Sequence, residues 1–235
     1  MKILATLLFS GLTFITYNVN AQEEIIIVDR EHKDYRRHRE IKLNDNTEVF
    51  KFAPLNMLIG EINFGYEKQI SQKSSLDFEF GPTISQISFG VNSHYIDPNG
   101  VSQIENGGIG FLASVGYRFY PLDETEALNR FYVSPVLKYK ILNHTVEETS
   151  GLVDDAKGSN TQFNFYFNFG YQIWAAKTFS LDFYTGLGIG YQHKIDQRIA
   201  YEYIDNSWNY FWEREEAKGA RYVFNMGLKL GIGKQ

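Results

Sequence analysis

The sequence predicts an all-β protein, an antiparallel up-and-down transmembrane β-barrel of about eight strands. After Thr47, apolar and polar residues alternate with a period of two, the period of a strand with two different faces. Short and long connections between these segments follow one another, as they do in outer-membrane barrels. Aromatic residues make up 16% of the chain and glycine occurs 20 times, a composition that suits a barrel wall.

The N-terminal residues have the features of a secretory signal. Lys2 forms a short positive region, an apolar run covers residues 3–15, and Val19-Asn20-Ala21 supplies the small-residue pattern of a cleavage site. Residues 1–21 are therefore predicted to be a signal peptide that is removed. No later apolar run approaches the ~20 residues that a spanning helix needs. The sequence has no cysteine near the cleavage site to carry a lipid anchor, so strands would have to hold the protein in a membrane.

Residues 22–46 differ in composition from the rest of the chain. They are dominated by charges of both signs, with one short apolar run at residues 25–28. Mixed charge runs of this kind usually stay solvated, so a flexible periplasmic lead-in is favoured over a binding element. The predicted organisation is a signal peptide at residues 1–21, the charged segment at 22–46 and the barrel at 47–235.

Six long amphipathic strands are visible in the alternation. The clearest are residues 163–173, 181–191 and 224–232, each with apolar side chains on one face and polar or small residues on the other. Three more cover residues 76–81, 111–119 and 133–141. Residues 49–70 predict two further strands with irregularities at Pro54 and Gly60, although a single overlong strand is the competing interpretation. Two strands give an even total, as expected for a bacterial single-chain barrel.

The connections predict the orientation of the barrel. Residues 72–74 and 175–177 are tight turns, and residues 121–129 form a somewhat longer turn on the same side. Residues 91–106, 144–160 and 194–219 are long and polar. Short turns are typical of the periplasmic rim and long loops of the outer rim.

A soluble lipocalin-like barrel would show the same alternation with its apolar face inward. The interior of about eight strands is just wide enough to be filled by side chains, and several phenylalanines per strand would overfill it. We therefore expect the rings to face lipid and the glycines and charges to face inward. Buried charges must pair, so a salt-bridged plug is favoured over an ion path. The predicted lumen network comprises Glu79, Arg118, Lys138, Lys140, Asp182 and Lys229.

The chain resembles the small outer-membrane β-barrel proteins of the OmpX/OmpA type, as found in Bacteroidetes-like bacteria. The resemblance rests on residues 52–67 (FAPLNMLIGEINFGYE), on Lys73-Ser74-Ser75-Leu76-Asp77, and on the glycine-rich strands that follow. Such barrels often end on an aromatic residue, whereas this chain ends Gly233-Lys234-Gln235. The resemblance implies residence in the outer membrane of a Gram-negative bacterium and a structural or adhesive role.

The sequence offers little for catalysis. The five histidines are His32, His38, His94, His144 and His193, and none forms part of a recognised catalytic motif. Ser93 and His94 are adjacent in a predicted extended loop and would point to opposite sides, while His193 near Asp196 has no evident serine partner. We therefore expect no enzyme activity, no catalytic or metal-binding residues and no cofactor. A lipid A modifying barrel enzyme is the less favoured alternative.

The last long loop is the most suggestive surface feature. Residues 198–204 alternate, Asp205-Asn206-Ser207 offers a turn, and an aromatic run follows, so the last two strands are expected to continue as a protruding hairpin. Its candidate interaction residues are Tyr201, Tyr203, Trp208, Tyr210 and Trp212. A purely interfacial role for the tryptophans is favoured over partner recognition. Expected partners are outer-membrane lipid and, through the outer loops, an extracellular protein or a glycan.

Net charge narrows the possible roles further. It is −5, and no basic stripe suggests binding to nucleic acid. The favoured role is a non-enzymatic structural or surface-adhesion protein. A small transport or pore component is the alternative, and it would require a continuous wet lumen.

Overall fold

The computed structural model describes residues 46–84, 94–96, 102–122, 127–149 and 151–234. The predicted signal peptide and nearly all of the predicted charged segment lie outside these residues. Among the described residues, no helix is both long and apolar enough to cross a membrane.

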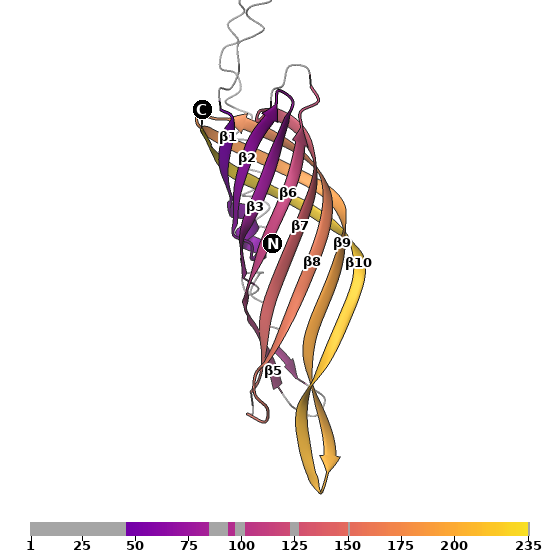
Figure 1. Ribbon diagram of the computed structural model, residues 1–235. Helices are drawn as coiled ribbons and strands as arrows, with labels where there is room; N and C mark the ends of the chain where they lie inside the picture. Colours follow the sequence, from indigo (N-terminus) through magenta and orange to yellow (C-terminus); the bar gives the residue numbers. More distant parts are fainter. Residues whose placement is uncertain (1–45, 85–93, 97–101, 123–126, 150, 235) are drawn as a thin grey trace, which may run out of the picture. The chain divides into compact units, whose positions relative to one another are not determined.

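The described chain is all-β, and its strands form one antiparallel sheet. Hydrogen bonds run round a closed ring of eight strands, in the order β1-β2-β3-β6-β7-β8-β9-β10 and back to β1, while β4 and β5 extend the sheet beside β7 (Figure 1). The elements are β1 (Glu48–Ala53), the 3₁₀ helix η3 (Pro54–Ile59), β2 (Asn63–Ser71), β3 (Ser74–Ile84), β4 (His94–Ile96), β5 (Ser102–Gly107), β6 (Ile109–Phe119), β7 (Arg130–Glu148), β8 (Ala156–Trp174), β9 (Phe179–Ile204) and β10 (Ser207–Lys234).

Two strands, not one, occupy residues 49–70. Pro54 has no backbone N–H to continue the ladder, and it begins the 3₁₀ helix that separates β1 from β2. Gly60 ends that helix with a φ of 77°, a conformation that favours glycine. β1 pairs with β2 on one side and with β10 on the other, so this short strand closes the ring. The expectation of about eight strands is confirmed for the ring.

The predicted long loops of the later strands are largely strand. β7 continues to Glu148, β8 begins at Ala156, and β9 and β10 extend as one paired ribbon far beyond their apolar segments. Polar residues mark these extensions, but they still alternate and pair across strands, so polarity alone was a poor guide to loop structure. The predicted hairpin is confirmed: Asp205 and Asn206 form its turn with φ of 50° and 64°.

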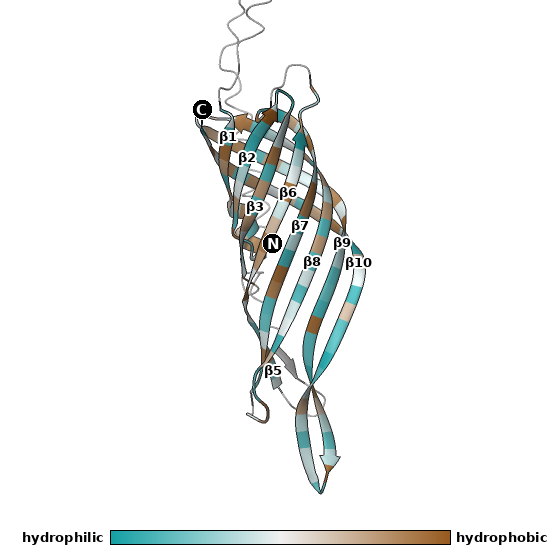
Figure 2. Cartoon of the chain, viewed as in Figure 1, coloured by the Kyte–Doolittle hydropathy of each residue, from teal (hydrophilic) through white to brown (hydrophobic). Residues whose placement is uncertain are grey.

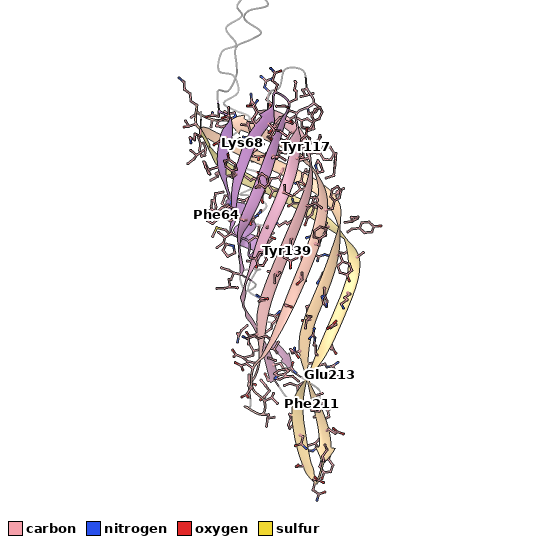
Figure 3. All side chains as sticks on the ribbon, in the orientation of Figure 1. Phe64, Lys68, Tyr117, Tyr139, Phe211 and Glu213 are labelled. Carbon is pink, nitrogen blue, oxygen red and sulfur yellow. The ribbon has the colours of Figure 1, made fainter. Side chains whose placement is uncertain are left out.

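The two faces of the ring differ as the alternation predicts. Phe163, Phe165, Phe167 and Phe169 of β8 are 40% to 52% exposed, whereas Asn164 and Asn168 between them are buried. Phe64, Tyr117 and Tyr139 carry the same outward pattern on β2, β6 and β7 (Figure 3). Figure 2 shows many hydrophobic residues on the ring and mainly hydrophilic ones on the extended part of β9 and β10. The ring therefore presents an apolar outer face and encloses a polar core.

Glycine makes room for aromatic rings inside the ring. A Cβ on Gly227 of β10 would lie 2.5 Å from the Tyr184 hydroxyl oxygen, and one on Gly170 of β8 would lie 2.2 Å from the Tyr132 ring. Both tyrosines are buried, at 7% and 1% exposure. The inward glycines of the alternating strands thus accommodate large side chains from neighbouring strands.

Candidate functional site

Arg118 of β6 lies at the centre of a buried ion-pair network inside the ring. Its guanidinium is 2.5 Å from the carboxylate of Asp77, 2.7 Å from that of Asp182 and 3.3 Å from that of Glu67. The ring of Tyr132 lies 4.2 Å from the guanidinium carbon. Because β6 and β9 are separated in the sheet by β7 and β8, the contact between Arg118 and Asp182 spans the lumen.

Two lysines flank the arginine. Lys51 of β1 lies 2.7 Å from Asp182 and also pairs with Glu67, while Lys229 of β10 lies 2.8 Å from Asp77 and also pairs with Glu79. All of these side chains are 11% exposed or less. β1, which closes the ring, and β10, the last strand, thus each contribute one lysine to the same network.

A second group of ion pairs is formed by Glu61, just before β2, and two lysines of β7. The Glu61 carboxylate lies 2.5 Å from the Lys138 ammonium and 2.9 Å from the Lys140 ammonium. Asn63 links this region to the first group by donating a hydrogen bond to Glu79 at 3.1 Å. Both groups lie among the buried polar residues inside the ring.

The formal charges of this lumen network cancel. Its five cations are Lys51, Arg118, Lys138, Lys140 and Lys229, and its five carboxylates are Glu61, Glu67, Asp77, Glu79 and Asp182. Buried tyrosines satisfy two of the carboxylates: Tyr132 donates to Asp182 at 2.7 Å and Tyr120 donates to Glu67 at 3.0 Å. Pairing of this kind is what makes buried charge tolerable.

Little space remains beside the network. A cavity bordered by Asp77, Arg118, Tyr184 and Lys229 measures about 10 Å³, which is close to the room needed by one water molecule. The lumen at this level is therefore filled by side chains, as expected for eight strands.

All six residues predicted for the lumen lie in this network. The prediction omitted Lys51, Glu61, Glu67 and Asp77. The alternation already placed Asp77 on the same face as Glu79, so it could have been included. Lys51 and Glu67 lie in the short segments where the strand pattern was ambiguous, and Glu61 precedes its strand and follows no alternation.

In the part of the sheet that extends beyond the ring, His144 of β7 faces two carboxylates. Its Nδ1 lies 3.8 Å from Glu105 of β5, and its Nε2 lies 3.4 Å from Asp196 of β9. The imidazole lies against Gly158 of the intervening strand β8, where a Cβ would approach Nε2 to 2.0 Å. His144, Glu105 and Asp196 border an open hollow of about 500 Å³.

His193 does not approach Asp196, its neighbour in sequence. It points to the other face of β9, and its Nε2 lies 3.4 Å from Glu216 of β10. Arg214 and Lys218 pair with the same carboxylate at 2.6 and 3.1 Å. The hydrogen bond from Lys218 is the main cause that lowers the pKa of Glu216 below that of a free glutamate. Ser93 and the side chain of His94 lie outside what the structure describes.

The predicted aromatic residues divide into a cluster and a separate tryptophan. The ring of Tyr201 lies 5.7 Å from that of Trp208 and 6.3 Å from that of Tyr210, and Tyr203 lies 5.0 Å from Trp208. Trp212 instead donates a hydrogen bond to the carbonyl of Asp154 at 2.5 Å. Figure 3 labels Phe211 and Glu213, which flank Trp212 in the sequence. Four of the five residues therefore form one aromatic surface, and the fifth ties the ribbon to the neighbouring turn.

Within the described residues, no group of three or more His, Asp or Glu side chains is arranged to hold a metal ion. Comparisons of the chain with protein-family models, with curated proteins and with solved structures found no match.

Proposed function

We propose that the protein is a transmembrane β-barrel of the outer membrane, with a non-enzymatic structural or surface-adhesion role. The observation that carries this proposal is the closed ring of eight strands with rings such as Phe167 and Phe183 exposed outside and a charge-neutral network buried inside. In water such an outer face would be an unusually large apolar surface. In a bilayer it is the face that a spanning barrel needs.

The filled lumen favours a structural or adhesive role over transport. Each charged side chain of the lumen network has at least one ion-pair partner, and the cavity beside it measures about 10 Å³. A conducting barrel needs a continuous path for water. A pore would therefore require the buried pairs to separate.

The extended sheet supports the adhesive part of the proposal. β9 and β10 carry the aromatic cluster of Tyr201, Tyr203, Trp208 and Tyr210 to the hairpin tip, at the end of the strands opposite the short turns. In the proposed setting this end lies outside the cell, because short turns face the periplasm. Exposed tyrosine and tryptophan side chains are frequent in binding surfaces.

Electrophoresis and proteolysis test this proposal together. In detergent, the membrane-extracted protein should migrate differently before and after boiling, because a closed sheet resists the detergent until it is heated. Protease added to intact cells should cut near the turn at Gly151 or at the hairpin turn of Asp205. A protein that is soluble in the periplasm and shows no heat-dependent shift would contradict the proposal and would direct the search to a hydrophobic ligand.

A further inference from the structure

One edge of β10 has no neighbouring strand among the described residues. β1 pairs with β10 only from Leu230 to Lys234, whereas β9 pairs with it from Ser207 to Ile232. Figure 1 shows β10 as the last strand of the extended part of the sheet. Between Ser207 and Lys229, β10 therefore has strand partners on one side only. This stretch is called the free edge below.

The register shows which backbone groups the free edge presents. The N–H of Gly233 donates to the carbonyl of Thr178, on the β9 side. Backbone groups of an antiparallel strand point alternately to its two neighbours, so odd-numbered residues of β10 face β9 and even-numbered ones face the free edge. The edge groups include those of Tyr222, Phe224 and Met226, whose side chains are 94%, 60% and 65% exposed. An edge of this kind is a template for another strand.

We propose that the free edge pairs with the free edge of a second copy of this chain, antiparallel and centred on Ala217. This register sets Glu216 opposite Lys218 and Glu213 opposite Arg221 of the other copy, in both directions. Opposite charges facing each other across strands are favourable. It covers the charged part of the free edge, because Trp212 then lies opposite Tyr222.

The same register also sets two aromatic residues opposite each other. Trp212 lies opposite Tyr222 of the other copy, at the end of the charged part of the free edge. Aromatic cross-strand pairs stabilise a sheet.

Neighbouring registers are unfavourable. Centring the pairing on Glu216 places the two Glu216 carboxylates face to face and sets Arg214 against Lys218. Centring it on Lys218 places two lysines face to face. Like charges directly opposite destabilise a sheet, so the charge pattern selects Ala217 as the centre.

The two-fold axis of this pairing inverts the second copy. The inference therefore rests on the proposed function and names its partner: a copy of the same chain on an apposed membrane surface. Two neighbouring barrels in one membrane share their orientation and cannot meet this way. The protein would join surfaces that both carry it.

Cysteine cross-linking tests the register directly, because the chain has no cysteine. Ala217 would face its own counterpart in a non-hydrogen-bonded pair, where Cα atoms are about 4.5 Å apart. That separation permits a disulfide. Purified Ala217→Cys in detergent should form a covalent dimer on mild oxidation. Glu215→Cys alone should not, but a mixture of Glu215→Cys and Gly219→Cys should give the mixed dimer.

Charge exchange tests the same pairing between membranes. Lipid vesicles carrying Glu216→Lys, and vesicles carrying Lys218→Glu, should each lose the clustering of the unaltered protein. Mixing the two kinds of vesicle should restore it, because each altered edge then faces opposite charges. Clustering that survives both substitutions, or a Glu215→Cys dimer as abundant as that of Ala217→Cys, would overturn the register.

The two experiments separate this inference from the proposed function. Cross-linking in detergent does not depend on the cellular location of the protein, whereas the heat-dependent shift and surface proteolysis do. A protein that passes the location tests but stays monomeric with Ala217→Cys refutes the self-pairing alone.

Discussion

The guanidinium of Arg118 on β6 donates a hydrogen bond to the Asp182 carboxylate on β9, across the lumen, at 2.7 Å. The same carboxylate accepts hydrogen bonds from Lys51 at 2.7 Å and from Tyr132 at 2.7 Å. One carboxylate therefore connects β1, β6, β7 and β9. Removing this carboxylate should therefore lower the stability of the whole ring and not only that of one strand pair.

We expect Asp182→Asn to destabilise the folded protein by about 3 to 5 kcal/mol, because it leaves the buried network with one uncompensated positive charge. The amide cannot balance Lys51 and Arg118, which stay buried. Denaturant unfolding in detergent micelles measures the change. The exposed Asp155→Asn is the matched control and should be nearly neutral. Equal stability of both variants would show that the network does not hold the ring.

Two glycine substitutions should differ sharply in their effect on the stability of the folded protein. A Cβ on Gly188 would lie 1.9 Å from the carbonyl oxygen of Phe165, a backbone atom of the adjacent strand, whereas a Cβ on Gly219 meets nothing within 4 Å. We expect Gly188→Ala to cost about 1 to 3 kcal/mol through overpacking. Gly219→Ala should be neutral or stabilising by up to about 1 kcal/mol. Thermal unfolding of the two variants compares them, and the reverse order would contradict the packing described for β8 and β9.

The unaltered protein should give no steady current in planar lipid bilayers. The side chains around Arg118 leave only about 10 Å³ of space, and their charges are paired. Arg118→Ala removes bulk and leaves one carboxylate uncompensated, so a leak that favours cations is expected from that variant. Stable channels from the unaltered protein would mean that the network opens, and the pore alternative would then replace the adhesive one.

Replacing Lys218 with methionine should raise the pKa of Glu216. The Lys218 hydrogen bond is the largest cause of the lowered pKa of this carboxyl, with smaller contributions from Arg214 and His193. Because the folded pKa is depressed, the cluster stabilises the ribbon above the unfolded pKa and loses that effect as the pH falls through the folded pKa. Carbon NMR titration of the Glu216 carboxyl follows the change, and an unaltered titration after Lys218→Met would exclude this assignment.

The strand character, the division into two faces and the polar nature of the interior were predictable from the amino-acid sequence. These properties depend on local alternation, which Phe163 to Ile173 display without any knowledge of neighbours. The same alternation placed Glu79, Arg118 and Asp182 on the inner face. The turn at Asp205 and Asn206 was also visible, because these residues tolerate positive φ.

The pairing of the inner charges and the position of the open edge were not predictable, because both depend on contacts between distant segments. Arg118 and Asp182 lie on strands that are not neighbours, so their contact depends on the closure of the ring by β1. The free edge of β10 arises because β1 is short and leaves the wall at Pro54. Strand pairing depends on relative register over long sequence separations, and no local pattern specifies it.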